Sequence, residues 1–171
     1  ARKLKIVVRA GAGYDNIDLD ASKARGVVVE NTPGQNSNAV AELALAMMIF
    51  MSRNQFTPVS GIEISGKKLG IQAFGNVGRL VGKKAAAMGM TVLATDPFIP
   101  VEKIAEAGAQ PVATVGELYS QCDFVSVHIP ATPETTGSIG YDLITSMPKG
   151  GTLVNTARKE VIDEAGLEKA L

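Results

Sequence analysis

The stretch from Lys67 to Pro97 constrains the fold most, because it has the pattern of one strand–helix–strand unit built around a glycine turn. Its first part predicts a strand that leads into a turn at Gly75. Arg79 to Met88 predicts a helix, which Gly89 ends. Thr91 to Asp96 predicts a short second strand that ends on an acid. This order is typical of a βαβ unit.

The glycines of this turn indicate a dinucleotide. Gly75 and Gly78 occupy the second and third glycine positions of the fingerprint G-x-G-x-x-G. A side chain at Gly75 would stand where a pyrophosphate approaches the backbone, and Gly78 lets the helix pack closely on the strand. The unpaired N–H groups at the helix start suit a diphosphate. The first fingerprint glycine is replaced by Ala73, which we expect the turn to tolerate only with a negative φ.

Asp96 lies 18 residues after Gly78, close to the spacing expected of an acid that binds a ribose diol. A carboxylate there repels a 2′-phosphate, so NAD is favoured over NADP as the cofactor. The alternative interpretation of the glycines is a tight strand–helix turn that binds no ligand. The second strand and its terminal acid favour the dinucleotide.

Composition limits the other classes of function. The 171 residues have zero net charge and no basic block, which disfavours nucleic acid as a partner. Cys122 is the only cysteine, so an internal disulfide and a Cys-based zinc cluster are excluded and a reducing cytoplasm is favoured. With one histidine in the chain, no metal site is expected. The apolar run at 39–51 contains Glu42 and is too short to span a membrane, so no membrane partner is expected.

Predicted strands alternate with predicted helices, and most strands are near-continuous apolar runs. This pattern is typical of an α/β fold with a doubly wound parallel sheet buried on both faces. The helix expected at 39–53 is apolar on nearly all sides, so it must be buried in its own core or against another subunit. The remaining strands are expected at 4–8, 27–29, 123–129 and 152–155, and the remaining helices at 19–25, 101–107, 115–119, 141–147 and from Asp163 to the end.

Ligands of such folds lie beyond the carboxyl ends of the strands. Four strand ends with unusual chemistry fall on that edge, namely Gly75, Asp96, His128–Pro130 and Thr156–Arg158. The glycine-rich loop at 10–13 is either a plain surface turn or a nest of N–H groups that binds an anion.

The chain resembles the D-isomer-specific 2-hydroxyacid dehydrogenases. The resemblance covers essentially all of the sequence and implies a Rossmann-type NAD-binding domain with a remnant of a flavodoxin-like substrate domain. It divides the chain into a partial substrate domain at 1–36 and a dinucleotide-binding domain at 37–171 that is incomplete at its C-terminal end. The segments that carry it are Arg9–Asp18, Asn31–Pro33, Asn36–Glu42, Gly66–Gly70, Cys122–Pro130, Thr135–Gly137, Asn155–Arg158 and Val161–Glu164.

The resemblance also implies roles for single residues. Arg158 corresponds to the catalytic arginine that holds the substrate carboxylate and polarises the carbonyl, a bidentate task that suits a guanidinium. Ala12 and Gly13 correspond to the loop whose N–H groups receive that carboxylate, and Ala12 also borders the nicotinamide. The cofactor residues implied are Ala12, Gly75, Asn76, Val77 and Gly78 near the pyrophosphate and nicotinamide, Asp96 at the ribose, and Ile129, Pro130, Thr156, Ala157 and Arg158 around the adenosine and nicotinamide.

Three further residues are not expected to be catalytic. His128 matches a strand-end position and not the catalytic histidine of the family, so it is expected to be structural or to line the cofactor. Cys122 is expected to fill the core. Lys159 replaces a glycine that is common in the family, and it either contacts a substrate phosphate or pairs with Glu160, which we favour.

The activity implied is NAD-dependent oxidation of a D-2-hydroxyacid. Among family substrates 3-phosphoglycerate, in serine synthesis, is favoured, with reduction of glyoxylate or hydroxypyruvate, or a non-catalytic NAD-binding scaffold, as alternatives. The sequence resembles a central segment of a larger enzyme. Because the acid–base pair of the family is absent from it, we expect no turnover by these residues alone. The resemblance further implies a homodimer through the helix at 39–53.

Overall fold

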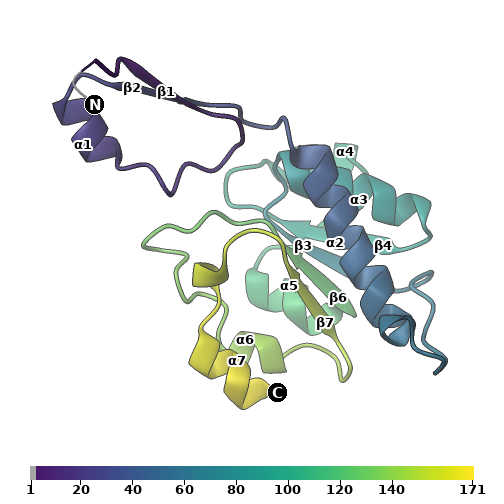
Figure 1. Ribbon diagram of the computed structural model, residues 1–171. Helices are drawn as coiled ribbons and strands as arrows, with labels where there is room; N and C mark the ends of the chain where they lie inside the picture. The colour runs from purple at the N-terminus through teal and green to yellow at the C-terminus, as the bar shows by residue number, and fades with distance from the viewer. Residues whose placement is uncertain (1–2) are drawn as a thin grey trace.

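A computed structural model of the chain describes residues 3–171, which form two parallel sheets with flanking helices (Figure 1). The smaller sheet pairs β1 (Ile6–Arg9) with β2 (Val28–Asn31), and α1 (Leu19–Ala24) connects them. Asp18 caps α1 by accepting a hydrogen bond from the Ala21 N–H at 2.8 Å. This small unit lies beyond one end of the larger sheet.

The larger sheet has five parallel strands in the order β5-β4-β3-β6-β7. Strand β3 lies at the centre, and the chain proceeds from it to β4 on one side and later to β6 on the other. The direction of winding therefore reverses between β3 and β6, which is where ligands of such folds bind. The strands are β3 (Lys68–Gln72), β4 (Thr91–Thr95), β5 (Gln110–Pro111), β6 (Phe124–Val127) and β7 (Thr152–Asn155), and the helices are α2 (Ser37–Ser52), α3 (Asn76–Ala87), α4 (Val101–Glu106), α5 (Val115–Gln121), α6 (Tyr141–Thr145) and α7 (Glu164–Ala170), with 3₁₀ turns η1 (Asn54–Phe56) and η2 (Lys159–Val161).

Both faces of this sheet are buried, which confirms the predicted fold class. Leu69 and Ile71 of β3 pack into one apolar cluster with residues of α2 and α3. Val125 and Val127 of β6 pack into a second cluster on the other face with residues of α5 and α6. Gly70 permits the close approach of α5, because a Cβ there would stand 2.9 Å from Cγ of Leu118.

Several element boundaries differ from the prediction. Helix α3 begins at Asn76 and not at Arg79, so Gly75 is its N-cap and the glycine turn leads directly into the helix. Helix α2 begins at Ser37 after Asn36, two residues before the predicted start. The short strand β5 and the turn η1 were not predicted, because two to three residues carry no period that a pattern can detect.

The expectation of a negative φ at Ala73 was wrong. Its φ is +74°, so alanine adopts the left-handed conformation that the first fingerprint glycine normally provides. The N–H of Ala73 donates to the Thr95 carbonyl at 3.0 Å, and this hydrogen bond ties the turn to the end of β4. The backbone path of the turn is thus kept at a conformational cost of about 1–2 kcal/mol.

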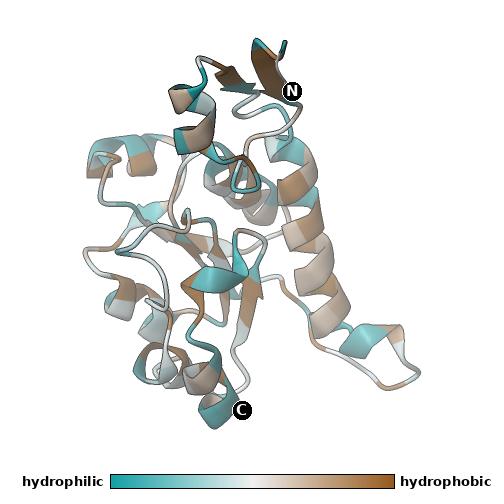
Figure 2. Cartoon of the chain, turned by 60° about the vertical axis from the view of Figure 1, so that its left-hand side comes forward, coloured by the Kyte–Doolittle hydropathy of each residue, from teal (hydrophilic) through white to brown (hydrophobic). Residues whose placement is uncertain are grey.

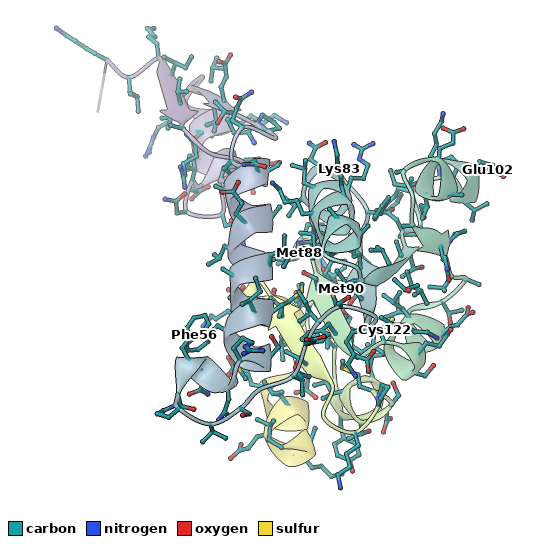
Figure 3. All side chains as sticks on the ribbon, turned by 90° about the vertical axis from the view of Figure 1, so that its right-hand side faces the viewer. Phe56, Lys83, Met88, Met90, Glu102 and Cys122 are labelled. Atoms are coloured by element: carbon teal, nitrogen blue, oxygen red, sulfur yellow. The ribbon has the colours of Figure 1, made fainter. Side chains whose placement is uncertain are left out.

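Helix α2 is buried on one side and exposed on the other. Ala41, Ala44 and Met48 are fully buried against the core, whereas Leu43 and Phe50 are 55% and 41% exposed. Figure 2 shows hydrophobic residues along the length of this long helix, and Figure 3 places Phe56 beside its C-terminal end. No helix within residues 3–171 has both the length and the apolar character needed to cross a membrane.

The strain at Ala73 can be measured. Ala73→Gly is expected to raise the free energy of unfolding by about 0.5–1 kcal/mol in urea denaturation, because relief of the positive φ exceeds the added chain entropy of glycine. Ala86→Gly, at an exposed position in the last turn of α3, is the control and should lower that free energy by about 0.5–1 kcal/mol. A similar loss in both variants would contradict a strained turn.

Candidate functional site

A cavity of about 790 Å³ lies between the smaller unit and the carboxyl edge of the larger sheet. Its walls come from segments far apart in the sequence, which the fold brings to the reversal point between β3 and β6. The lining residues are Arg9 and residues 12–16 of the smaller unit, Asn36, Val40 and Val77 of the α2 and α3 regions, residues 128–132 after β6, and residues 156–158 after β7.

The glycine turn after β3 has the geometry of an anion cradle. A Cβ at Gly75 would meet no atom within 4 Å, so the space in front of the turn is open. A Cβ at Gly78 would lie 2.3 Å from the Ala73 carbonyl oxygen, so only glycine lets α3 start this close to β3. The first three N–H groups of α3 donate no hydrogen bond to any described residue. They are therefore available to a diphosphate.

Two backbone N–H groups fix Asp96 beside this turn. The Phe74 N–H donates to one carboxylate oxygen and the Phe98 N–H to the other, each at 2.8 Å. Each oxygen keeps lone pairs that can accept a further hydrogen bond. The carboxylate thus lies at the end of β4 with capacity for a diol, and its side chain is half-buried.

The loop after β7 is held by the Asn155 side chain. Its amide donates to the Arg158 carbonyl at 2.7 Å, and its oxygen accepts the Ala157 N–H at 2.9 Å. Within this loop, Oγ1 of Thr156 is buried and has no hydrogen-bond partner among residues 3–171. This hydroxyl in the cavity wall is therefore available to hydrogen-bond with a ligand.

The Arg158 guanidinium makes the only contact between charged side chains that joins the two units within residues 3–171. Its Nε and Nη2 donate to one carboxylate oxygen of Asp15 at 3.0 and 2.6 Å, and its Nη1 donates to the Ala157 carbonyl at 2.9 Å. The hydrogen bonds from Arg158 hold the pKa of Asp15 below its usual value. Both side chains remain partly exposed, at 39% for Arg158 and 66% for Asp15.

The glycine-rich loop at 10–13 lies against this guanidinium. A Cβ at Gly13 would clash with Nη2 of Arg158, so glycine lets the guanidinium lie against the loop in its present position. Asn31 orients the loop by donating to the Ala12 carbonyl at 2.7 Å. The N–H groups of Ala12 and Gly13 donate no hydrogen bond within the described chain. This geometry favours the anion-binding interpretation over a plain turn.

The structure shows the surroundings of the three residues that were not expected to be catalytic, His128, Cys122 and Lys159. His128 lines the cavity, its Nε2 lies 2.9 Å from Oγ of Ser126, and burial lowers its pKa to about 4. A neutral imidazole with that pKa is a weak proton acceptor at neutral pH. Cys122 is fully buried beside α5, and burial raises its pKa to about 11 (Figure 3). Lys159 forms no ion pair with any residue between 3 and 171, so the expected pairing with Glu160 was wrong.

The structure brings together most of the residues that the sequence singled out. Eight of the twelve residues given a binding or catalytic role line the 790 Å³ cavity, and the other four, Gly75, Asn76, Gly78 and Asp96, lie at the neighbouring turn. Two residues of the site were not predicted, namely Asp15, which pairs with Arg158, and Arg9, which lines the same cavity. Only charge complementarity across 143 residues could have indicated the first pair. The eight residues in the cavity are Ala12, Gly13, Val77, Ile129, Pro130, Thr156, Ala157 and Arg158.

These groups fit a nicotinamide dinucleotide. The open space at Gly75, the free N–H groups of α3 and the held carboxylate of Asp96 match a diphosphate followed by a ribose diol. The partnerless Thr156 hydroxyl lies in the wall of the adjoining cavity. Residues 3–171 contain no cluster of three or more His, Cys, Asp or Glu side chains placed to hold a metal ion.

Comparison with known proteins gives one consistent family. D-3-phosphoglycerate dehydrogenase of Methanocaldococcus jannaschii is 40% identical over 184 residues, which cover 100% of this chain and 35% of that protein. NAD⁺-bound 3-phosphoglycerate dehydrogenase of Entamoeba histolytica superposes with a TM-score of 0.89 at 49% identity, over 98% of this chain and 53% of that one. A glyoxylate reductase from Paecilomyes thermophila superposes with a TM-score of 0.84 at 32% identity, over 99% and 55%.

The chain therefore spans about a third of the length of the curated relatives it matches. Residues 39–171 match the NAD binding domain of the D-isomer specific 2-hydroxyacid dehydrogenases. The fold, the glycine turn and the acid at the end of β4 agree with that match, and the chain belongs to the D-isomer specific 2-hydroxyacid dehydrogenase family, whose cofactor is NAD.

Proposed function

We propose that the protein carrying this chain is an NAD-dependent oxidoreductase that interconverts a D-2-hydroxyacid and its 2-oxoacid. The observation that carries the proposal is the position of the Arg158 guanidinium in one cavity with Thr156 and Val77, next to the turn at Gly75. Bound NAD supplies the hydride acceptor at its nicotinamide ring. The chain's own residues bind and orient the two reactants.

Each group has a defined task in this proposal. The N–H groups of Asn76 and Val77 bind the pyrophosphate and Asp96 accepts hydrogen bonds from the ribose diol. Ile129, Pro130, Thr156 and Ala157 line the nucleoside parts of the pocket. Arg158 binds the substrate carboxylate through two parallel N–H bonds and polarises the reacting carbonyl, with the Ala12 and Gly13 N–H groups on its other side.

The favoured substrate is 3-phosphoglycerate, which would place the reaction in serine synthesis. The relatives named D-3-phosphoglycerate dehydrogenase support this choice, because they match the whole chain at about 40% identity. Arg9 supports it as well, since it adds a second cation to the cavity that holds Arg158. Reduction of glyoxylate is the second candidate, supported by the similarity to a glyoxylate reductase.

Turnover tests the proposal directly. The protein carrying this chain should oxidise NADH with 3-phosphohydroxypyruvate and should use NADPH at least ~10-fold less efficiently, because Asp96 repels the 2′-phosphate. Arg158→Gln should lower kcat/KM by about 100-fold or more, because the carboxylate loses two charge-assisted hydrogen bonds.

Two other outcomes would change the assignment. Turnover of glyoxylate without turnover of the phosphorylated acid would keep the reaction class and contradict the serine-pathway substrate. Binding of NADH without turnover of either acid would contradict an enzyme and support the non-catalytic scaffold.

We also propose a homodimer through α2. Leu43, Met47 and Phe50 are exposed on the side of α2 that faces away from the core, and Phe56 packs edge-to-face on Phe50 with ring centroids 5.4 Å apart. An exposed apolar surface of this kind marks a protein–protein contact.

We further propose that residues 1–36 belong to a substrate domain and residues 37–171 to the dinucleotide-binding domain. The separate two-stranded sheet supports this division. A reducing cytoplasmic location is proposed from the single, buried thiol.

The dimer is tested by a charge on that surface. Met47→Glu should shift a concentration-dependent dimer to monomer in sedimentation velocity, because the interface would bury an unpaired carboxylate. Val101→Glu is the matched control, since Val101 is 55% exposed and lies next to Glu102, on the opposite side of the molecule from α2 (Figure 3). A wild-type protein that stays monomeric at high concentration would rule the proposal out.

A further inference from the structure

The Asp15 carboxylate occupies an edge of the Arg158 guanidinium to which a substrate carboxylate would bind. Its oxygen accepts from Nε and Nη2, the two donors on one edge of the guanidinium. A ligand carboxylate can bind the same edge through two parallel N–H bonds, one to each of its oxygens. The remaining nitrogen of the guanidinium, Nη1, donates a hydrogen bond to the Ala157 carbonyl. These three bonds use three of the five N–H donors of Arg158, and one donor on Nη1 and one on Nη2 stay unused.

We infer that Asp15 is an intramolecular competitor for the carboxylate site, which occupies the edge formed by Nε and Nη2 of Arg158 in the absence of substrate and lowers the affinity for acids. This inference rests on the proposed role of Arg158 as the carboxylate-binding residue. A 2-oxoacid or 2-hydroxyacid would replace Asp15 at the same edge, one carboxylate exchanging for another without transfer of a proton or an electron.

The surroundings of the pair support exchange over a fixed structural bridge. Asp15 is 66% exposed, and within residues 3–171 no side chain other than that of Arg158 donates a hydrogen bond to its carboxylate. The Asp15 carboxylate can therefore turn into solvent when a ligand carboxylate binds Arg158. The free N–H groups of Ala12 and Gly13 lie in the same loop and would remain for the incoming anion.

The strength of the competition follows from the exposure of the pair. Solvent-exposed ion pairs are weak, so the closed state is populated only about one- to fivefold over the open state. A competitor of this strength raises the apparent Kd for a ligand by a factor of one plus the ratio of closed to open state. Removal of the Asp15 charge should then tighten carboxylate binding by about two- to sixfold.

Binding of oxamate, an unreactive analogue of a 2-oxoacid, tests the inference apart from turnover. The Nε–H signal of Arg158, assigned by its loss in Arg158→Gln, would be followed by NMR during titration of the NADH-loaded protein. Asp15→Asn should bind oxamate about two- to sixfold more tightly than wild type. Asp20→Asn, which removes an exposed acid of the same unit that does not touch Arg158, should bind it like wild type.

The sign of the change decides the outcome. Tighter binding by Asp15→Asn, and by Asp15→Ser as a second variant, supports competition. Equal binding by the two proteins, or no binding by either, overturns it. Weaker binding by Asp15→Asn also overturns it and would identify Asp15 as a residue that positions Arg158. Failure of the proposed function gives a different result. In that case the wild-type protein does not oxidise NADH with either acid, although Asp15→Asn still binds oxamate more tightly than wild type.

Discussion

The contact between Gly78 and the Ala73 carbonyl is the constraint on which the rest of the structure depends. A Cβ at position 78 would lie 2.3 Å from that oxygen, so helix α3 can begin where it does only with glycine there. The position of α3 in turn directs its three unpaired N–H groups at the space in front of Gly75. The Phe74 N–H, in the same turn, binds Asp96 and so fixes the acid at the end of β4.

Much of the fold was predictable from the sequence because it depends on local patterns. The βαβ unit, the parallel sheet and the helix ends at Gly89 and Gly108 follow from apolar runs and from glycines with positive φ. The start of α3 was missed by three residues, since Asn76, Val77 and Gly78 are poor helix formers by propensity. Their helical conformation is imposed by packing on β3, which no local pattern records.

The site was less predictable because it depends on residues far apart in the chain. Arg158, Ala12 and Gly13 were assigned by family resemblance, and by residue type alone an arginine after a strand indicates only a surface ion pair. The structure shows such a pair, with Asp15, inside the cavity that the resemblance assigns to substrate. The positive φ at Ala73 was predicted with the wrong sign, because the turn requires the left-handed path and the surrounding hydrogen bonds enforce it on alanine.

The turn at Gly75 and the carboxylate of Asp96 together have the geometry of an NAD site. Fluorescence titration of the protein with NADH and with NADPH, for wild type and Asp96→Asn, tests it most directly, because the substitution removes the charge and keeps a hydrogen-bond acceptor. We expect wild type to bind NADH about tenfold or more tightly than NADPH, and Asp96→Asn to narrow this affinity ratio at least ~3-fold. Equal affinities for the two cofactors in wild type, or an unchanged ratio in the variant, would contradict it.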